Sequence, residues 1–280
     1  MTGIRIVTDS ACDVPDDVLA EHRIGVVPLT IRFGDEDLID REELSPAEFW
    51  QRCETFAGLP ETAAPSAGRF EELFRRLASE GAEGIVCVCI SAELSATAQS
   101  AGIAAQSVAD TIPVRVIDSR FVSLGQGLIV LAAAEVADLG KGLDDVVAAA
   151  EDAIPRTRVF ATLDTLENLR KGGRIGAAKA MIGSLLSFKP IIAVEDGVVA
   201  EAGRQRTRAR SLRHLVDKVA EHGEVENVTV VHGQAADLEQ FLDMLGEIHP
   251  RDRITTAILG PVVGTHAGPG TMGVAFQLRS

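Results

Sequence analysis

Two basic side chains of this chain occupy glycine-rich segments where they could meet a negatively charged ligand. Arg174 follows a Gly-Gly pair in the segment KGGRI, and His266 lies in the segment GTHAGPG. Glycine lets a backbone approach a ligand closely, and arginine and histidine both suit an anionic group. The alternative is structural, with Arg174 capping an element and His266 an ordinary residue of a rigid loop. Spacing alone favours the structural alternative for each.

Hydroxyl side chains form a second candidate set in the first half of the chain. Ser66 is placed to cap the helix that follows Pro65, whereas Thr62 lies too early for that cap and its hydroxyl is free for another task. In the segment SAELSAT, capping the next helix fits Ser91 best and leaves the role of Ser95 open.

The sequence carries no complete motif of a common enzyme class. The segment GPGTMG at 268–273 spells GxGxxG, but a strand-like end follows it and its proline removes an N–H that a phosphate would need, so we reject a nucleotide site. GxSxG, Walker A and HExxH motifs are missing, and so is any zinc-spaced cluster, so we expect no cofactor and no metal. A hydrolase assembled in space from Ser95, His266 and an aspartate stays open.

Composition restricts the partners. The chain has 280 residues and a net charge of −14, which argues against nucleic acid or an anionic membrane as the main partner. Residues 4–8 read as a strand rather than a signal peptide, and the longest apolar run, 127–134, is too short to span a membrane. The four cysteines are expected to be reduced thiols, with Cys87 and Cys89 on one side of a buried strand. We therefore expect a soluble, cytoplasmic protein.

Strands and helices are expected to alternate through the first half. Strands are predicted at 4–8, 24–33, 84–90 and 114–117, and helices after Ser45 and Ser66 and at 93–108, 128–139 and 143–154. This order implies a mainly parallel sheet with flanking helices, and ligands on such sheets sit at the carboxyl ends of the strands. Short polar side chains follow three of these ends: Asp9-Ser10, Ser91 with Ser95, and Asp118-Ser119.

The second half predicts a different, α+β lobe. Asp196-Gly197 between strands at 190–194 and 198–202 is a strong hairpin signal. Further strands are predicted at 159–163, 228–232, 254–258 and 274–278, and helices at 166–170, 175–188, 211–221 and 238–246. We place the boundary near Pro155, which gives an N-terminal α/β lobe of residues 1–155 and a C-terminal α+β lobe of residues 156–280.

Eight segments, in order along essentially the whole chain, resemble the signature series of the DegV family. They are IVTDSACDVP, VVPLTIRFGDEDLID, ETAAPS, CISAELSATAQSA, VIDSR, LENLRKGGRIG, FKPIIAVEDGVV and GTHAGPGTMGVAF. The resemblance implies a two-lobed α/β protein with a long-chain fatty acid in an apolar tunnel between the lobes. It also implies the lipid-binding subunit of bacterial fatty acid kinase, which is not itself an enzyme and presents the acyl carboxylate to a separate ATP-dependent kinase subunit.

The resemblance also assigns site residues. Thr62 matches the threonine of the family's TSxPS segment and Ser95 the serine of its LSGT segment, and both would donate hydrogen bonds to the carboxylate. Arg174 matches the arginine of the GGRI turn and His266 the histidine of the HxGPG loop, and both would lie near the head group. The chain departs from the family pattern at three positions, which are Ala63, Ala96 and Ala98.

A fatty acid is also physically reasonable as the ligand. Each buried methylene contributes about 0.8 kcal/mol, so a sixteen-carbon tail would contribute roughly ten kcal/mol before the costs of association. A buried carboxylate needs charge-assisted donors, which two hydroxyls, an arginine and a histidine would supply. A serine hydrolase acting on lipid esters through Ser95 and His266, and a lipid-sensing regulatory protein, are the alternatives.

A cluster of arginines is a candidate docking surface for the kinase. The residues are Arg204, Arg206, Arg208, Arg210 and Arg213. Their spacing of two over 204–210 would put four guanidinium groups on one side of an extended segment. The alternative is a solvated face that protects an edge strand from aggregation. A transient contact with a membrane surface is left open, and no nucleic-acid partner is expected.

Overall fold

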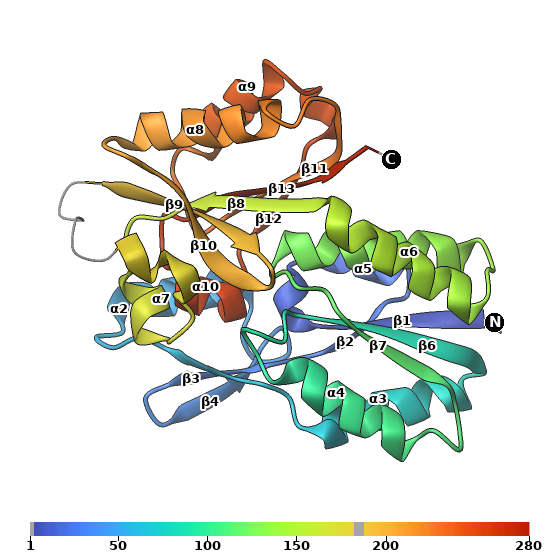
Figure 1. Ribbon diagram of the computed structural model, residues 1–280. Coiled ribbons are helices and arrows are strands. Elements are labelled where there is room, and N and C mark those ends of the chain that lie inside the picture. The colour runs from blue at the N-terminus through green and yellow to red at the C-terminus, as the bar shows by residue number, and fades with distance from the viewer. Residues whose placement is uncertain (1–2, 182–187, 280) are drawn as a thin grey trace.

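The computed structural model describes residues 3–181 and 188–279 and shows two main sheets with a layer of two helices between them (Figure 1). The first sheet is parallel, with the strand order β2 (Gly25–Val27), β1 (Gly3–Asp9), β6 (Ala82–Cys89) and β7 (Val114–Asp118). One face packs against α3 (Ala67–Ser79) and α4 (Thr97–Ser107), and the other against α5 (Leu124–Asp138) and α6 (Leu143–Arg156). The predicted parallel sheet with flanking helices is confirmed.

The second sheet is mixed and has six strands. Their spatial order is β10 (Val198–Gln205), β9 (Lys189–Glu195), β8 (Thr157–Thr162), β13 (Met272–Leu278), β11 (Val225–His232) and β12 (Thr255–Ile258). Helices α8 (Arg208–Ala220) and α9 (Leu238–Gly246) cover its outer face. The predicted hairpin is confirmed: β9 and β10 are antiparallel, and Asp196 and Gly197 at the turn both have positive φ, as a tight hairpin turn requires.

Small elements fill the space between the two sheets at one end. A three-stranded antiparallel sheet has the order β4 (Glu36–Ile39), β3 (Thr30–Phe33) and β5 (Glu61–Ala63). Beside it lie α2 (Pro46–Thr55), α7 (Glu167–Lys171) and α10 (Pro261–Ala267). A capping box between Ser45 and Glu48 starts α2, as predicted. One apolar cluster includes residues of β3, β4, α2, α7 and α10 and joins both halves of the chain.

Several predicted elements differ from the observed ones. The strand predicted at 24–33 is two strands in different sheets, because the chain turns at Pro28, whose missing N–H ends the pairing of β2 with β1. The helix predicted at 93–108 begins only at Thr97 and leaves residues 91–96 as a loop. Of the helix predicted at 175–188, the described part is a 3₁₀ helix at Gly176–Met181, and residues 182–187 lie outside the described residues.

The remaining elements are short, and the helix expected after Pro15 is present. Helix α1 (Asp16–Glu21) follows a 3₁₀ turn at Ser10–Cys12, and a second such turn at Arg251–Arg253 precedes β12. Ser66 stands at the N-cap of α3 but makes no side-chain capping bond, so only its position is confirmed. The Sγ atoms of Cys87 and Cys89 lie 3.7 Å apart on one side of the buried β6, as predicted.

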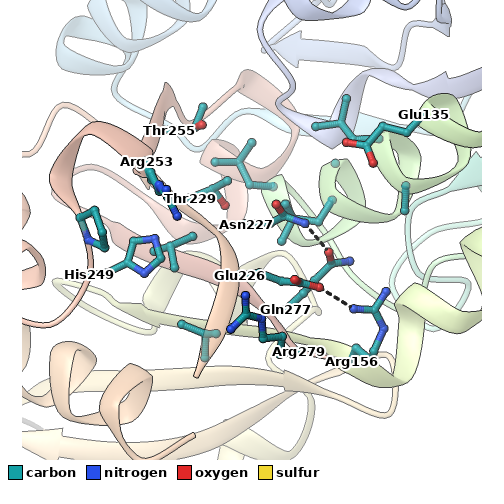
Figure 2. Close-up of a pocket in the computed structure, with 18 of the residues that line it drawn as sticks. Glu135, Arg156, Glu226, Asn227, Thr229, His249, Arg253, Thr255, Gln277 and Arg279 are labelled. Carbon is teal, nitrogen blue, oxygen red and sulfur yellow. Dashed lines mark hydrogen bonds and ion pairs between the residues drawn. The ribbon is translucent and has the colours of Figure 1, made fainter. Parts of the chain in front are cut away.

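A groove of about 970 Å³ separates α5 from β11 and the end of β13. Figure 2 shows its labelled polar residues, among them Glu135 of α5 and Asn227, Thr229 and Gln277 of the six-stranded sheet. Thr62, Ser95, Arg174 and His266 are not among the residues that line it. No helix in the described ranges, 3–181 and 188–279, has both the length and the apolar character needed to cross a membrane.

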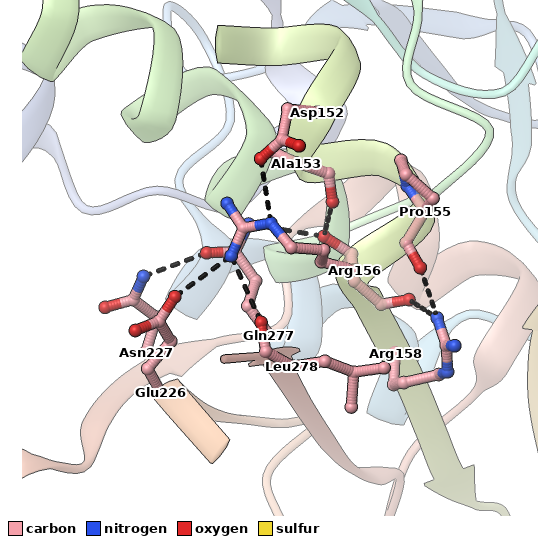
Figure 3. Close-up of polar contacts among 10 residues, drawn as sticks. Asp152, Ala153, Pro155, Arg156, Arg158, Glu226, Asn227, Gln277 and Leu278 are labelled. Atoms are coloured by element: carbon pink, nitrogen blue, oxygen red, sulfur yellow. Dashed lines mark hydrogen bonds and ion pairs between the residues drawn. The ribbon is translucent and has the colours of Figure 1, made fainter. Parts of the chain in front are cut away.

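Arg156 at the end of α6 ties this helix to the six-stranded sheet. Its guanidinium contacts Asp152 at 2.9 Å, Glu226 of β11 at 2.9 Å and the carbonyl oxygen of Leu278 at 3.1 Å (Figure 3). Because α6 leads directly into β8, this arginine ties the last turn of the helix to two strands of the second sheet. Pro155 lies inside that last turn, and the division of the chain into lobes at this residue stays a proposal.

Candidate functional site

A cavity of about 230 Å³ lies between the two sheets and contains all four head-group residues suggested by the sequence. Thr62, Ser95, Arg174 and His266 line it, and each is half-buried. The other lining residues are apolar: Leu29, Ala64, Ile90, Leu94, Ala96, Val122, Leu169, Ile192, Val194, Val199, Val262, Val263 and Ala267. The cavity therefore combines an apolar wall with a small set of polar groups, as ligand-binding pockets do.

Thr62 and His266 meet directly at the edge of this cavity. Thr62 belongs to β5, which pairs with β3, and its Oγ1 lies 3.0 Å from Nε2 of His266. We expected His266 on a rigid loop, but it lies in the last turn of α10, which Pro261 starts at the first helical position. The positive φ of Gly268 ends the helix just beyond it.

Arg174 reaches the cavity from the turn after α7. The turn reverses at Gly173, whose φ of 72° favours glycine. The guanidinium donates from Nε to the carbonyl of Leu94 at 3.2 Å and from Nη1 to the carbonyl of Gly172 at 2.7 Å. The first of these bonds holds Arg174 against the loop that carries Ser95. It therefore links two head-group residues that come from different halves of the chain.

The loop at residues 91–96 positions Ser95. Its hydroxyl lies 2.8 Å from Oγ1 of Thr97 at the start of α4. Ser91 does not reach the cavity; its hydroxyl donates to the carbonyl of Gly197 at the tip of the β9–β10 hairpin. The prediction that Ser91 serves structure and leaves Ser95 available agrees with these contacts. The Ser91 hydroxyl also accepts from the backbone N–H of Glu93 at 3.3 Å, so it caps the turn ahead of α4 and joins this loop to the hairpin.

His266 is an uncharged side chain near neutral pH. Burial and the neighbouring Arg174 guanidinium lower the pKa of His266 to about 4. Its Nδ1 is buried and has no hydrogen-bond partner among the described residues. The ring packs against Gly172, where a Cβ atom would lie 2.3 Å from Nδ1. Gly172 is therefore a site residue that sequence reasoning passed over, although the Gly-Gly pair before Arg174 was its signal.

Two further cavities adjoin the first one. A cavity of about 60 Å³ shares Val122, Ile192, Val194, Val263 and Ala267 with it and continues among apolar side chains over the inner face of the six-stranded sheet. On the other side, an open cavity of about 530 Å³ shares Thr62, Arg174 and His266. The polar residues therefore stand between an apolar interior and an opening to solvent.

The polar residues at the other strand ends are structural. Asp9 accepts bonds from the backbone N–H of Ile90 and Ala11, and Asp118 from those of Ala92 and Arg120. Neither carboxylate lines the cavity, which corrects the expectation that three strand ends converge on a ligand. Only Ser95 of that set does so.

The geometry does not support a Ser95–His266 catalytic pair. The hydrogen-bond partner of His266 is Thr62, and that of Ser95 is Thr97. A triad needs a carboxylate on the second ring nitrogen, whereas Nδ1 of His266 has no partner within the described ranges. With its pKa near 4, this imidazole is also a weak base at neutral pH.

The arginine cluster does not form the one-sided stripe considered from the sequence. The segment is not extended throughout: β10 ends at Gln205 and α8 begins at Arg208. Arg204 pairs with Glu201 at 2.7 Å, Arg208 with Asp237 at 2.7 Å, and Arg213 with Glu247 at 2.8 Å. Arg206 and Arg210 are exposed, and a docking role for the cluster stays a prediction.

Comparisons with known proteins agree with this architecture. A family model described as "Uncharacterised protein, DegV family" matches residues 3–279. A DegV domain-containing protein of Streptomyces coelicolor is 36% identical over 285 residues, which cover 99% of each chain. One from Deinococcus radiodurans is 35% identical over 281 residues, 98% of each chain.

Solved structures share the whole fold. A DegV family protein from Thermus thermophilus, whose structure describes fatty acid binding, has a TM-score of 0.90 at 32% identity and covers 99% of this chain and 100% of its own. DegV from Bacillus subtilis, described as a fatty acid binding protein, has a TM-score of 0.87 at 28% identity over 100% of both chains. From the match over its full length, this chain belongs to the DegV family.

Proposed function

We propose that this protein binds one long-chain fatty acid, with the carboxylate at Thr62, Ser95, Arg174 and His266 and the tail in the apolar cavity. The observation that carries this proposal is the composition of the cavity wall: Thr62, Arg174 and His266 lie where it meets the open cavity, Ser95 is the fourth polar side chain, and the rest are apolar. An amphiphile with one small anionic head and a long apolar tail matches that division. The fatty-acid-binding relatives from Thermus thermophilus and Bacillus subtilis support it.

The contacts of the polar end suit a carboxylate. A carboxylate removed from water needs several donors, and a cationic donor strengthens the bonds. The hydroxyls of Thr62 and Ser95 bond to His266 and Thr97, and each hydroxyl can rotate toward a ligand oxygen. The neutral His266 adds one N–H at most, so the positive charge comes from Arg174.

The tail would lie along the inner face of the six-stranded sheet. The narrow cavity that continues the first one is lined by side chains of β8, β9 and β13, including Val159, Ala161, Ile192 and Ala275. These small and branched side chains leave room that aromatic residues would fill. A structure from Eubacterium ventriosum, described as a stearic acid-binding protein, has a TM-score of 0.88 at 25% identity and supports a long saturated chain.

The open cavity suggests that the bound carboxylate is presented to a second protein. It exposes Thr62, Arg174 and His266 to solvent, together with Lys171. The chain carries no Walker A motif, so a separate ATP-dependent fatty acid kinase subunit would supply the phosphoryl group and form the acyl phosphate. In this role the protein works in the cytoplasm as a carrier for phospholipid synthesis, touches membranes only transiently, and is not itself an enzyme.

Lipid analysis of the purified protein tests the proposal. Denaturing extraction followed by mass spectrometry should release about one long-chain fatty acid per chain, and delipidated protein should take up palmitate with the same stoichiometry. Protein that carries no fatty acid and takes up none after delipidation would rule out the carrier function. Formation of acyl phosphate from the loaded protein, a fatty acid kinase and ATP then separates a carrier from a lipid sensor.

A further inference from the structure

Two buried aspartates at the end of β1 each hold one side of the head-group site. Asp9 is the last residue of β1, and Asp13 follows the short 3₁₀ turn beyond it. Asp9 is 0% exposed and Asp13 5%, although neither lines the cavity. A buried carboxylate is costly unless it accepts hydrogen bonds, so the partners of these two groups show what they support.

Asp9 holds the loop that carries Ser95. Its Oδ2 accepts a bond from the backbone N–H of Ile90 at 2.7 Å, and its Oδ1 accepts one from that of Ala11 at 3.1 Å. Ile90 is a wall residue of the cavity and the first residue after β6, and the chain reaches Ser95 five residues later. The carboxylate therefore fixes the point at which this loop leaves the sheet.

Asp13 holds the start of α10 across the boundary between the sheets. Its Oδ1 accepts a bond from the backbone N–H of Gly260 at 3.1 Å, and the Ser123 hydroxyl donates a short bond to Oδ2. The approach is so close that a Cβ atom on Gly260 would lie 2.4 Å from Oδ1. Gly260 is the N-cap of α10, and His266 lies six residues on, about 9 Å along the helix axis.

We infer that Asp9 and Asp13 are positioning residues for the fatty-acid carboxylate, Asp9 acting through the Ser95 loop and Asp13 through α10 and His266. This inference rests on the proposed function. A short helix is a rigid unit, so a shift at Gly260 carries Val262, Val263 and His266, which all line the cavity, with it. Two acidic residues four apart in one turn thus set the separation of the two sides of the site.

The ionisation of Asp13 should make its effect on palmitate binding depend on pH. A purely structural role of this residue would not produce that dependence. Burial raises the pKa of Asp13 to about 7, and the negative charge of Asp40 also raises it. The Ser123 hydroxyl, the Arg41 guanidinium and the Gly260 N–H lower this pKa, but by less than burial raises it. Only the ionised carboxylate accepts from both donors with a full charge. Asparagine has nearly the same shape and stays uncharged, so it resembles the protonated form.

The chain contains its own reporter for α10. Trp50 is the single tryptophan, its Nε1 donates to the carbonyl of Leu259 at 2.9 Å, and its ring packs against Gly264. Leu259 directly precedes Gly260, so movement of the helix start changes the surroundings of the indole. Its fluorescence emission follows α10 whether or not a ligand is bound.

The experiment compares Asp13→Asn, Asp13→Ala and Asp9→Asn with wild type for palmitate affinity and Trp50 emission. At pH 6, Asp13→Asn should bind palmitate as tightly as wild type does. At pH 8 it should bind palmitate about tenfold more weakly than wild type, the loss expected for weakened buried hydrogen bonds. Asp13→Ala should bind weakly at both values and shift the emission. Asp9→Asn should weaken binding without shifting the emission, and the exposed Asp17→Ala should change neither.

The outcomes separate this inference from the proposed function. Wild-type affinity and unchanged emission in both Asp13 variants at pH 8 would overturn the role of Asp13. If Asp13→Ala does not fold, Asp13→Asn with its pH profile carries the test alone. If wild-type protein takes up no palmitate, the proposed function fails, while the emission of Trp50 in the Asp13 variants still shows whether this carboxylate places α10.

Discussion

The hydroxyl of Thr62 and Nε2 of His266 lie 3.0 Å apart, although 204 residues separate them in the chain. The contact joins β5 of the small sheet to the last turn of α10. The bond fixes the orientation of both side chains at the polar end of the cavity. Preorganised donors bind with a smaller loss of conformational entropy than donors that must first be ordered.

Removal of the hydroxyls should weaken fatty-acid binding. Thr62→Val keeps the shape of the side chain, and Ser95→Ala removes a single oxygen, so each change leaves ligand oxygens or local partners without a donor. We expect each to reduce the binding free energy for palmitate by about 1–3 kcal/mol, measured by titration calorimetry. Ser66→Ala is the control, because Ser66 is exposed and makes no capping bond. Unchanged affinity in the double variant would place the carboxylate elsewhere.

Much of the architecture follows from local pattern. The alternation of buried strands with amphipathic helices predicted the parallel sheet, and Asp196-Gly197 predicted the hairpin, because both signals lie within a few neighbouring residues. The break at Pro28 was also visible, but the apolar run on both sides of it read as one strand. A single apolar run in the sequence can contain two strands of different sheets, because the strands that each of them pairs with lie far away in the sequence.

The site could be predicted only in part for the same reason. The identity of its residues came from family resemblance, whereas their contacts depend on how the second sheet closes on the first. No spacing rule connects Thr62 with His266, or Arg174 with the carbonyl of Leu94. Helix α10 was missed because its seven residues include two valines and a glycine, which are weak helix formers. It exists because Pro261 starts it and because Asp13 and Trp50 hold it from other elements.

Gly172→Ala should disturb His266 without changing any polar group. The added Cβ would lie 2.3 Å from Nδ1, so either the imidazole or the turn after α7 must move. We expect palmitate affinity to fall by about tenfold, in line with a strain of about 1–3 kcal/mol from overpacking. Gly102→Ala is the matched control, since a Cβ there meets nothing within 4 Å and alanine favours the helix. Equal affinities for the two variants would contradict the close packing.

Asp40 should make the protein less stable as the pH rises. Burial raises the pKa of Asp40 from 3.8 to about 6, and the neighbouring Ser10 hydroxyl and Arg41 offset this only in part. Between pH 4 and 6 the folded protein therefore keeps a proton that the unfolded chain has released, and the unfolding free energy falls across this window. Asp40→Asn should remove this loss, so its stability relative to wild type should rise from pH 4 to pH 7.

Urea unfolding at several pH values measures this difference. Comparing variant with wild type cancels groups that do not sense Asp40, such as His266, whose lowered pKa acts in the opposite direction. The pKa of Asp13, which Asp40 raises, should fall in the variant. Asp37→Asn in β4, three residues before Asp40, is the control: the exposed Asp37 has a pKa lowered by Arg32, so its contribution is lost as the pH falls. A pH-independent difference for Asp40→Asn would mean that this carboxyl is charged throughout.

Arg174 and His266 should matter more for phosphoryl transfer than for binding. Both line the open cavity as well as the apolar one, so they face the position that an approaching kinase would occupy. Arg174→Ala and His266→Ala should therefore lower the rate of acyl phosphate formation by a larger factor than palmitate affinity. Parallel measurements on loaded protein give both numbers. Equal losses in rate and affinity would make these residues simple binding groups.

Exposed arginines beside β10 should steer the kinase. Arg206 and Arg210 are exposed on a chain of net charge −14, and the Arg206 guanidinium lies 5.9 Å from the centre of the Phe188 ring. Exposed charges at the rim of an interface mainly change the association rate and its salt dependence. Arg206→Glu with Arg210→Glu should therefore slow association with the kinase, flatten its response to salt and leave palmitate binding intact.

Two comparisons make this last prediction specific. Arg208 is left unchanged because its ion pair with Asp237 supports α8, and reversing its charge would test folding rather than docking. Arg69→Glu with Arg76→Glu on α3 changes the net charge by the same amount on another helix and should affect association far less. Stopped-flow association at low and moderate ionic strength resolves the two effects. Equal slowing by both double variants would mean that only overall charge matters, and no slowing by either would make the arginines beside β10 a solvated edge.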